Sequence, residues 1–149
     1  MREVAVILPI RDNKILLQLR DDKKGIDYPG LWGFFGGSIE SGETPLQGAK
    51  RELLEEISYS ADELVFLEQR KFFSCKNVIS YAYYCELKIP LESLVLVEGS
   101  DFKLVTISEI STNKIYSCKL RGYFTLADCQ YIHDVSTVAL DKYSNKYRL

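Results

Sequence analysis

Runs of apolar residues separated by polar turns predict that the chain opens with a β-hairpin. Residues 4–8 are almost continuously apolar, as in a strand covered on both faces, and residues 15–19 form a second run. The polar stretch from Arg11 to Lys14 between them is typical of a turn. From Arg20 to Gly42 the pattern breaks down into glycines, Pro29 and interspersed aromatic residues. A loop of that length in a small domain is more often functional than idle.

A clear helix start follows this loop. Thr44 suits an N-cap, Pro45 suits the first helical position, and Gln47 completes a capping box. The later pattern predicts strands at 64–73, 78–87 and 102–105, a short helical turn at 107–110, and a final helix that Thr125 and Asp128 cap and that reaches about Tyr143. We therefore expect an α/β sandwich with a mixed sheet, formed by a single domain over residues 1–149.

Composition narrows the class of protein. A chain of 149 residues with 46% hydrophobic and 27% charged residues is neither disordered nor fibrous. The four cysteines are scattered without a C-x-x-C pair, which indicates reduced thiols and a cytoplasmic protein. No apolar run is long enough for a membrane span. Proteins that bind along a long nucleic acid usually carry an excess of basic residues, whereas this chain has a net charge of −2. We therefore expect no long nucleic acid as a partner.

Three carboxylates share one face of the helix predicted after Thr44. On a helical wheel Glu52, Glu55 and Glu56 cluster within little more than one turn. The opposite, core-facing stripe comprises Leu46, Ala49, Leu53 and Ile57. An acidic face by itself is more often solvated, with partners such as Arg51, than a metal site. A hard divalent cation, however, prefers such oxygen ligands.

The residues around these carboxylates follow a longer pattern. Residues 37–59 read GSIESGETPLQGAKRELLEEISY, which fits G-x5-E-x7-R-E-U-x-E-E-x-G-U, where U is aliphatic, except at its last two specified positions. This stretch resembles the Nudix box of hydrolases that act on nucleoside diphosphates linked to another group. Ser58 replaces the usual glycine, Tyr59 the aliphatic residue, and Phe35 precedes the glycine pair where many members carry proline. The departures concern the helix exit and the loop shape, since no carboxylate is lost.

The resemblance implies a Nudix-type α/β/α sandwich and a Mg²⁺-dependent pyrophosphohydrolase, with Mn²⁺ as a possible substitute. The implied metal ligands are Glu52, Glu55, Glu56 and the carbonyl of Gly37. The implied supporting residues are Glu43 and Arg51, which would brace the loop against the helix, and Glu40 in the outer shell. For the general base that takes a proton from the attacking water, the candidates are Glu55 or Glu56, with Glu98 and Asp101 as alternatives.

The expected substrate is a small nucleotide, either a nucleoside triphosphate or a nucleotide sugar. Arg20 ends the second strand where relatives place a basic residue on phosphates, and Tyr28 is the candidate for stacking on a base. Two alternatives stay open: a catalytically silent nucleotide sensor, and a pyrophosphohydrolase of RNA 5′ ends. The sequence leaves open whether the protein is a monomer or a homodimer.

Overall fold

The computed structural model describes residues 2–72 and 77–146, and its central strand is the apolar run that opens the sequence. This strand, β1 (Arg2–Arg11), pairs antiparallel with β2 and β4 and parallel with β6. The other strands of the sheet are β2 (Lys14–Leu19), β3 (Trp32–Gly33), β4 (Phe35–Ser38), β5 (Val65–Phe72), β6 (Val78–Glu86) and β7 (Asp101–Val105). Within the described residues they form one seven-stranded mixed sheet. The prediction of a mixed sheet is confirmed.

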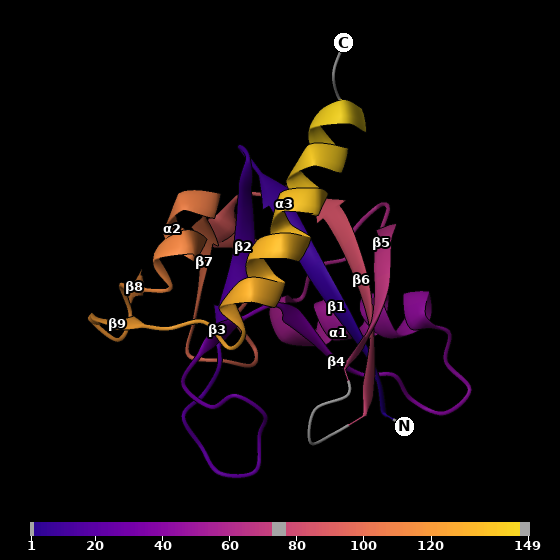
Figure 1. Cartoon of the computed structure of the whole chain (residues 1–149), viewed down its shortest axis with the longest axis horizontal. Coiled ribbons are helices and arrows are strands. Elements are labelled where there is room, and N and C mark those ends of the chain that lie inside the picture. The colour runs from indigo at the N-terminus through magenta and orange to yellow at the C-terminus, as the bar shows by residue number, and fades with distance from the viewer. Residues whose placement is uncertain (1, 73–76, 147–149) are drawn as a thin grey trace.

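Helices cover both faces of this sheet (Figure 1). On one face α1 (Pro45–Ile57) encloses a core with Ala5, Leu16 and Phe35. On the other face α2 (Ile107–Thr112) and α3 (Cys129–Lys146) enclose a second core around Trp32. A short 3₁₀ helix spans Leu91–Ser93. The predicted α/β/α sandwich is confirmed, and no helix in the described part of the chain is long and apolar enough to cross a membrane.

Helix α1 begins and ends as its local sequence dictates. The Thr44 hydroxyl accepts from the Gln47 N–H, and the Gln47 side chain accepts from the Thr44 N–H, so the predicted capping box is confirmed. Leu46 was expected in the core but is 37% exposed, while Glu56 is only 2% exposed. The buried face of α1 includes Glu56, so it lies further round the helix than predicted. Leu46, in the first turn, therefore lies at the edge of this buried face. The helix exits through Ser58 in the left-handed conformation (φ 53°).

The region predicted as one loop, residues 20–42, also contains β3 and β4. Both are short and rich in glycine and aromatic residues, and they pair with β2 and β1. Strands this short carry too few alternating positions for a periodic pattern, which is why the sequence did not reveal them. The β1–β2 turn is confirmed, with Asp12 and Asn13 both at positive φ.

The C-terminal third differs from prediction in two places. Residues 115–124, which carried no prediction, form a separate hairpin of β8 (Ile115–Ser117) and β9 (Gly122–Phe124). Asp128 alone caps α3, by accepting from the Tyr131 N–H. Thr125 was wrongly predicted as part of this cap: its carbonyl accepts from the Trp32 N–H, which holds residue 125 beside β3. Cys75 and Phe73 lie outside the described residues; Cys85, Cys118 and Cys129 are free thiols.

Candidate active site

Two glycines of β4 allow its backbone to approach the carboxylates of α1. A Cβ on Gly36 would lie 2.0 Å from the Ala5 carbonyl oxygen, and its φ of +146° also favours glycine. The Gly36 N–H donates to Glu56 Oε2 at 3.0 Å. A Cβ on Gly37 would lie 2.6 Å from Glu52 Oε1. The Glu52 and Glu56 carboxylates therefore both lie against the bare backbone of the glycine pair.

Burial makes these two carboxylates costly to ionise together. Glu56 is 2% exposed, and its burial raises its pKa to about 8, with the Glu52 charge adding to the effect. Burial also raises the pKa of Glu52, although hydrogen bonds from Arg51 act in the opposite direction. The Gly36 N–H and the charge of Arg20 oppose the shift at Glu56. A buried carboxylate at Glu56 beside a partly buried one at Glu52 is suited to an added positive charge.

Arg51 braces the loop that precedes α1. Its Nε and Nη2 donate to the two oxygens of Glu43 at 2.7 and 3.0 Å, and Nη2 also donates to the Ser38 carbonyl at 2.9 Å. The hydrogen bond from Arg51 lowers the pKa of Glu43. Glu40 lies 3.7 Å from Arg51, and its N–H donates to Glu43. The structure thus shows the predicted bracing by Glu43 and Arg51, with Glu40 at its exposed edge.

Arg51 also donates hydrogen bonds to two of the three helix carboxylates that were expected to act together. Its Nη1 donates to Glu52 Oε1 at 3.0 Å and to Glu55 Oε2 at 3.2 Å. Glu55 lies about half exposed beside this guanidinium, whereas Glu52 and Glu56 face the glycines. Within the described residues, no group of three or more His, Cys, Asp or Glu side chains is arranged to hold a metal ion. The same nitrogen of Arg51 thus contacts both Glu52 and Glu55, and the role of Glu55 as a metal ligand stays a prediction.

The residues present fit a hard divalent cation. Glu52 and Glu56 offer carboxylate oxygens, and the Gly37 backbone, where a Cβ would collide with Glu52, leaves space beside them. Mg²⁺ commonly binds through one or two carboxylates while keeping several waters. Two carboxylates and an adjacent backbone carbonyl therefore suffice for that cation.

A turn between the 3₁₀ helix (Leu91–Ser93) and β7 brings a fourth carboxylate toward this pair. The charge of Glu98 adds to the raised pKa of both Glu52 and Glu56, which indicates that its carboxylate lies near the pair. Gln18 Nε2 donates to the Glu98 carbonyl at 2.9 Å, and the Val97 N–H donates to the Glu56 carbonyl at 2.8 Å. Gln18, which is 2% exposed, carried no prediction. A polar residue within the apolar run 15–19 is the sequence signal that could have identified it.

Asp101, the other alternative base, is not brought to this site. Along β7, Phe102 and Leu104 pack against the core under α1, whereas Val105 belongs to the core on the opposite face. Alternation places Asp101 on that opposite face with Val105. Its two oxygens accept from the Ser117 hydroxyl at 2.7 Å and from the Phe102 N–H at 2.8 Å. Asp101 therefore fastens the β8–β9 hairpin to the sheet.

The two predicted substrate-binding residues lie in the loop that follows β2. The Arg20 Nε donates to the Asp27 carbonyl at 2.6 Å, and the Arg20 charge lowers the pKa of Glu56, which places it beside the carboxylates. Tyr28 is 55% exposed and has φ 51°. Tyr28 is thus open to a stacking partner, whereas Trp32, Phe34 and Phe35 are buried in the cores.

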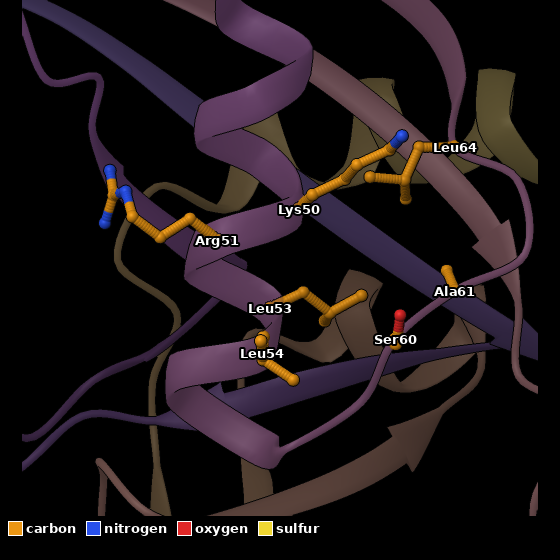
Figure 2. Close-up of a pocket in the computed structure, with 7 residues that line it drawn as sticks. All are labelled: Lys50, Arg51, Leu53, Leu54, Ser60, Ala61 and Leu64. Atoms are coloured by element: carbon orange, nitrogen blue, oxygen red, sulfur yellow. The ribbon is translucent and has the colours of Figure 1, made fainter. Parts of the chain in front are cut away.

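A cavity of about 240 Å³ lies on another side of α1 (Figure 2). The helix and the segment after it line this cavity through Lys50, Leu53, Leu54, Ser60, Ala61 and Leu64, with the stem of Arg51 at the edge. Figure 2 shows Lys50 and Leu64 on one side of the helix and the Arg51 guanidinium on the other. Glu52 and Glu56 do not line this cavity, so it is separate from the carboxylate site.

Comparisons with known proteins agree with this geometry. The family model for the NUDIX domain matches residues 1–123. An oxidized purine nucleoside triphosphate hydrolase of Mus musculus is 41% identical over 63 residues, which cover 42% of this chain and 38% of that protein. The ADP compounds hydrolase NudE of Escherichia coli is 38% identical over 83 residues, 52% of this chain and 44% of that protein. The chain thus spans less than half the length of these relatives.

A solved structure extends the likeness to the whole fold. The MutT protein from Methanosarcina mazei superposes with a TM-score of 0.71 at 19% identity, covering 96% of this chain and 94% of that one. At this identity the superposition shows the fold alone. The glycine pair, the braced loop and the acidic helix occupy residues 36–56, inside the segment that the family model matches. The chain belongs to the Nudix family.

Proposed function

We propose that the protein is a Mg²⁺-dependent pyrophosphohydrolase that cleaves a nucleoside diphosphate linked to another group. The observation that carries this proposal is the pair of the partly buried Glu52 and the buried Glu56, held against the bare backbone of Gly36 and Gly37. An acidic pair built only for surface solvation would not lie in a glycine-lined recess. The proposal extends to a cytoplasmic protein that acts as a monomer or homodimer.

Each side chain has a separate role in this proposal. Glu52, Glu56 and the Gly37 carbonyl would hold the cation, which supplies neutralisation of phosphate charge and acidification of a bound water. Glu55 would be a further ligand or the group that takes the proton of the attacking water, and Glu98 is the other candidate for that proton. Arg51 keeps the glycine loop against the helix through Glu43 and Ser38.

The substrate side of the proposal rests on the β2–β3 loop and on the relatives. Arg20 carries a positive charge beside the carboxylates and suits a phosphate, and the exposed ring of Tyr28 suits a base. The two curated relatives are named for a nucleoside triphosphate and for ADP compounds. We therefore propose a small nucleotide of one of these two kinds, a nucleoside triphosphate or a nucleotide sugar.

The deciding experiment is a panel of nucleoside triphosphates, including oxidised purines, and of ADP-linked compounds, assayed with Mg²⁺ and with Mn²⁺. We expect one group of substrates to yield a mononucleotide together with pyrophosphate or the phosphorylated partner group. Glu56→Gln should reduce the rate by about a hundredfold or more, while Glu92→Gln, at an exposed position, should not. Glu55→Gln and Glu98→Gln then identify the proton acceptor by loss of the acidic limb in the pH profile, since the base must be deprotonated to act.

Three results would contradict the proposal. Nucleotide binding without any product would favour the sensor alternative. Turnover confined to triphosphorylated RNA would favour the alternative of 5′-end trimming. Near-normal activity of Glu56→Gln would remove the site assignment itself, since Glu56 is the most deeply buried of the helix carboxylates.

A further inference from the structure

The β8–β9 hairpin stands outside the seven-stranded sheet at one edge of the molecule (Figure 1). Residues 113–124 read NKIYSCKLRGYF and contain three basic residues and no acidic residue. Nothing in the proposed hydrolysis uses this segment. Its charge contrasts with the net charge of −2 of the whole chain.

The two faces of the hairpin differ in character. Ile115 and Ser117 point inward and are 1% and 0% exposed. Tyr116 and Tyr123 lie opposite each other across the strands, 37% and 60% exposed, with ring centroids 5.1 Å apart in an edge-to-face arrangement. Lys114 Nζ lies 4.9 Å from the centroid of the Tyr123 ring. The outer face therefore presents two neighbouring aromatic rings and a cation.

Two further cations flank these rings at the hairpin turn. Lys119 and Arg121 are both exposed there. In the described part of the chain, no carboxylate forms an ion pair with Lys114, Lys119 or Arg121. We define the tyrosine hairpin as the set of Lys114, Tyr116, Lys119, Arg121 and Tyr123.

Acidic residues near the tyrosine hairpin are already engaged. Asp101 is buried and accepts from the Ser117 hydroxyl on the inner face. Glu109 lies 3.9 Å from Lys103, whose ammonium also donates to the Tyr116 carbonyl at 3.1 Å. The positive charge of the outer face is thus not cancelled by neighbours on β7 or α2.

The tyrosine hairpin is fixed to the rest of the protein from its inner face. Trp32 Nε1 donates to the Ile115 carbonyl at 3.1 Å, and the Ser117–Asp101 bond is 2.7 Å. Both anchors belong to segments of the main sheet, β3 and β7. A platform held in this way loses little conformational entropy when a ligand binds.

We propose that the tyrosine hairpin binds single-stranded nucleic acid. Exposed aromatic rings stack on nucleobases of any sequence, and unpaired cations contact the phosphates between them. Two exposed rings and three exposed cations on one hairpin match several consecutive nucleotides, whereas a mononucleotide would bury only one ring. This binding does not depend on turnover at the carboxylate site. It also revises the expectation, drawn from net charge, that no long nucleic acid binds.

The test measures fluorescence anisotropy of a labelled oligothymidylate of about 12 nucleotides. The whole protein is titrated in low salt with EDTA, which suppresses metal-dependent hydrolysis. One variant, Tyr116→Ser/Tyr123→Ser, removes both rings and keeps the charge. A second, Lys119→Ser/Arg121→Ser, removes two charges and keeps the rings. Matched controls are Phe66→Ser, an exposed aromatic residue on β5, and Lys142→Ser, an exposed lysine on α3.

We expect loss of the two rings to weaken binding by about tenfold or more. Loss of the two charges should reduce the slope of log affinity against log salt by about 1.4. Tyr116→Phe/Tyr123→Phe, which keeps both rings and removes only the hydroxyls, should bind like the wild type. The proposal would be overturned if the wild type did not bind the oligonucleotide, or if the control variants lost as much affinity as the hairpin variants. It would also be overturned if a duplex bound with equal affinity, or if thymidine monophosphate displaced the oligonucleotide at the same concentration.

Discussion

The side-chain amide of Gln18 on β2 donates to the backbone carbonyl of Glu98, 80 residues later in the chain, at 2.9 Å. The adjacent Gly99 has φ +98°, and a Cβ on it would lie 2.9 Å from Gln18 Nε2 and 3.1 Å from the Leu19 carbonyl. The turn that carries Glu98 is therefore seated directly on β2. A buried amide inside an apolar strand sets the position of an acid that faces the carboxylate pair.

Replacing Gln18 should test this relationship. Gln18→Met preserves the volume but removes the donor, which costs about 1–3 kcal/mol in the free energy of unfolding. We expect kcat to fall by about tenfold while KM changes little, because the Glu98 carboxylate shifts relative to the reacting water. Urea unfolding and steady-state kinetics on the best substrate provide the two measurements. Gln130→Met, which removes an exposed amide from α3, should leave kcat unchanged.

Gly37→Ala should separate activity from stability. The new Cβ would meet the end of the flexible Glu52 side chain at 2.6 Å, so the carboxylate moves while the backbone stays. We expect Mg²⁺ affinity and rate to fall by about tenfold or more with little change in melting temperature. Gly36→Ala differs because its Cβ would meet the Ala5 carbonyl at 2.0 Å, and should fail to fold stably.

Gly42→Ala provides the control for that pair. Its φ is +82°, but nothing lies within 4 Å of the new Cβ. It should cost about 1 kcal/mol of stability through strain alone and leave the rate unchanged. Equal kinetic effects of Gly37→Ala and Gly42→Ala would contradict the placement of Gly37 at the site.

Ser58→Gly should stabilise the protein. Ser58 ends α1 in the left-handed conformation at φ 53°, where glycine avoids a cost of about 1 kcal/mol. Thermal or urea unfolding checks the gain. Asn113→Gly is the informative comparison, since Asn113 ends α2 at the same φ but its side chain accepts from the Leu126 N–H. That variant should lose stability, and a gain of equal size in both would contradict the argument.

Cysteine reactivity should distinguish two of the described thiols. Burial raises the pKa of Cys85 to about 12, whereas Cys118 is exposed on the β8–β9 hairpin. The thiolate is the reactive form, so a raised pKa leaves Cys85 almost entirely protonated near pH 8. Iodoacetamide pulses followed by peptide mass spectrometry should modify Cys118 rapidly and Cys85 only at the rate of unfolding. Modification of both at one rate would show that β6 is open to solvent.

Much of the site followed from local sequence. The Thr44–Gln47 capping box, the Glu43–Arg51 bracing and the facing of Glu52 and Glu56 appear as the motif predicts. These features depend on residues close in the chain, or on a spacing that one loop and one helix fix. The predictions for Leu46 and Thr125 were wrong because contacts with other elements of the fold determine the surroundings of these two residues.

The sequence by itself determined the kind of residues available and the local elements that carry them. Only the tertiary structure decided that Glu98 joins the carboxylate pair and that Asp101 does not, although the two are three residues apart. The reason is that side chains along β7 alternate between the two faces of the sheet, which places Asp101 on the face opposite α1. Glu98 lies in the turn before β7, on the side of the carboxylate pair. Gln18 and Gly36 acquired their environments in the same way, from segments distant in the chain.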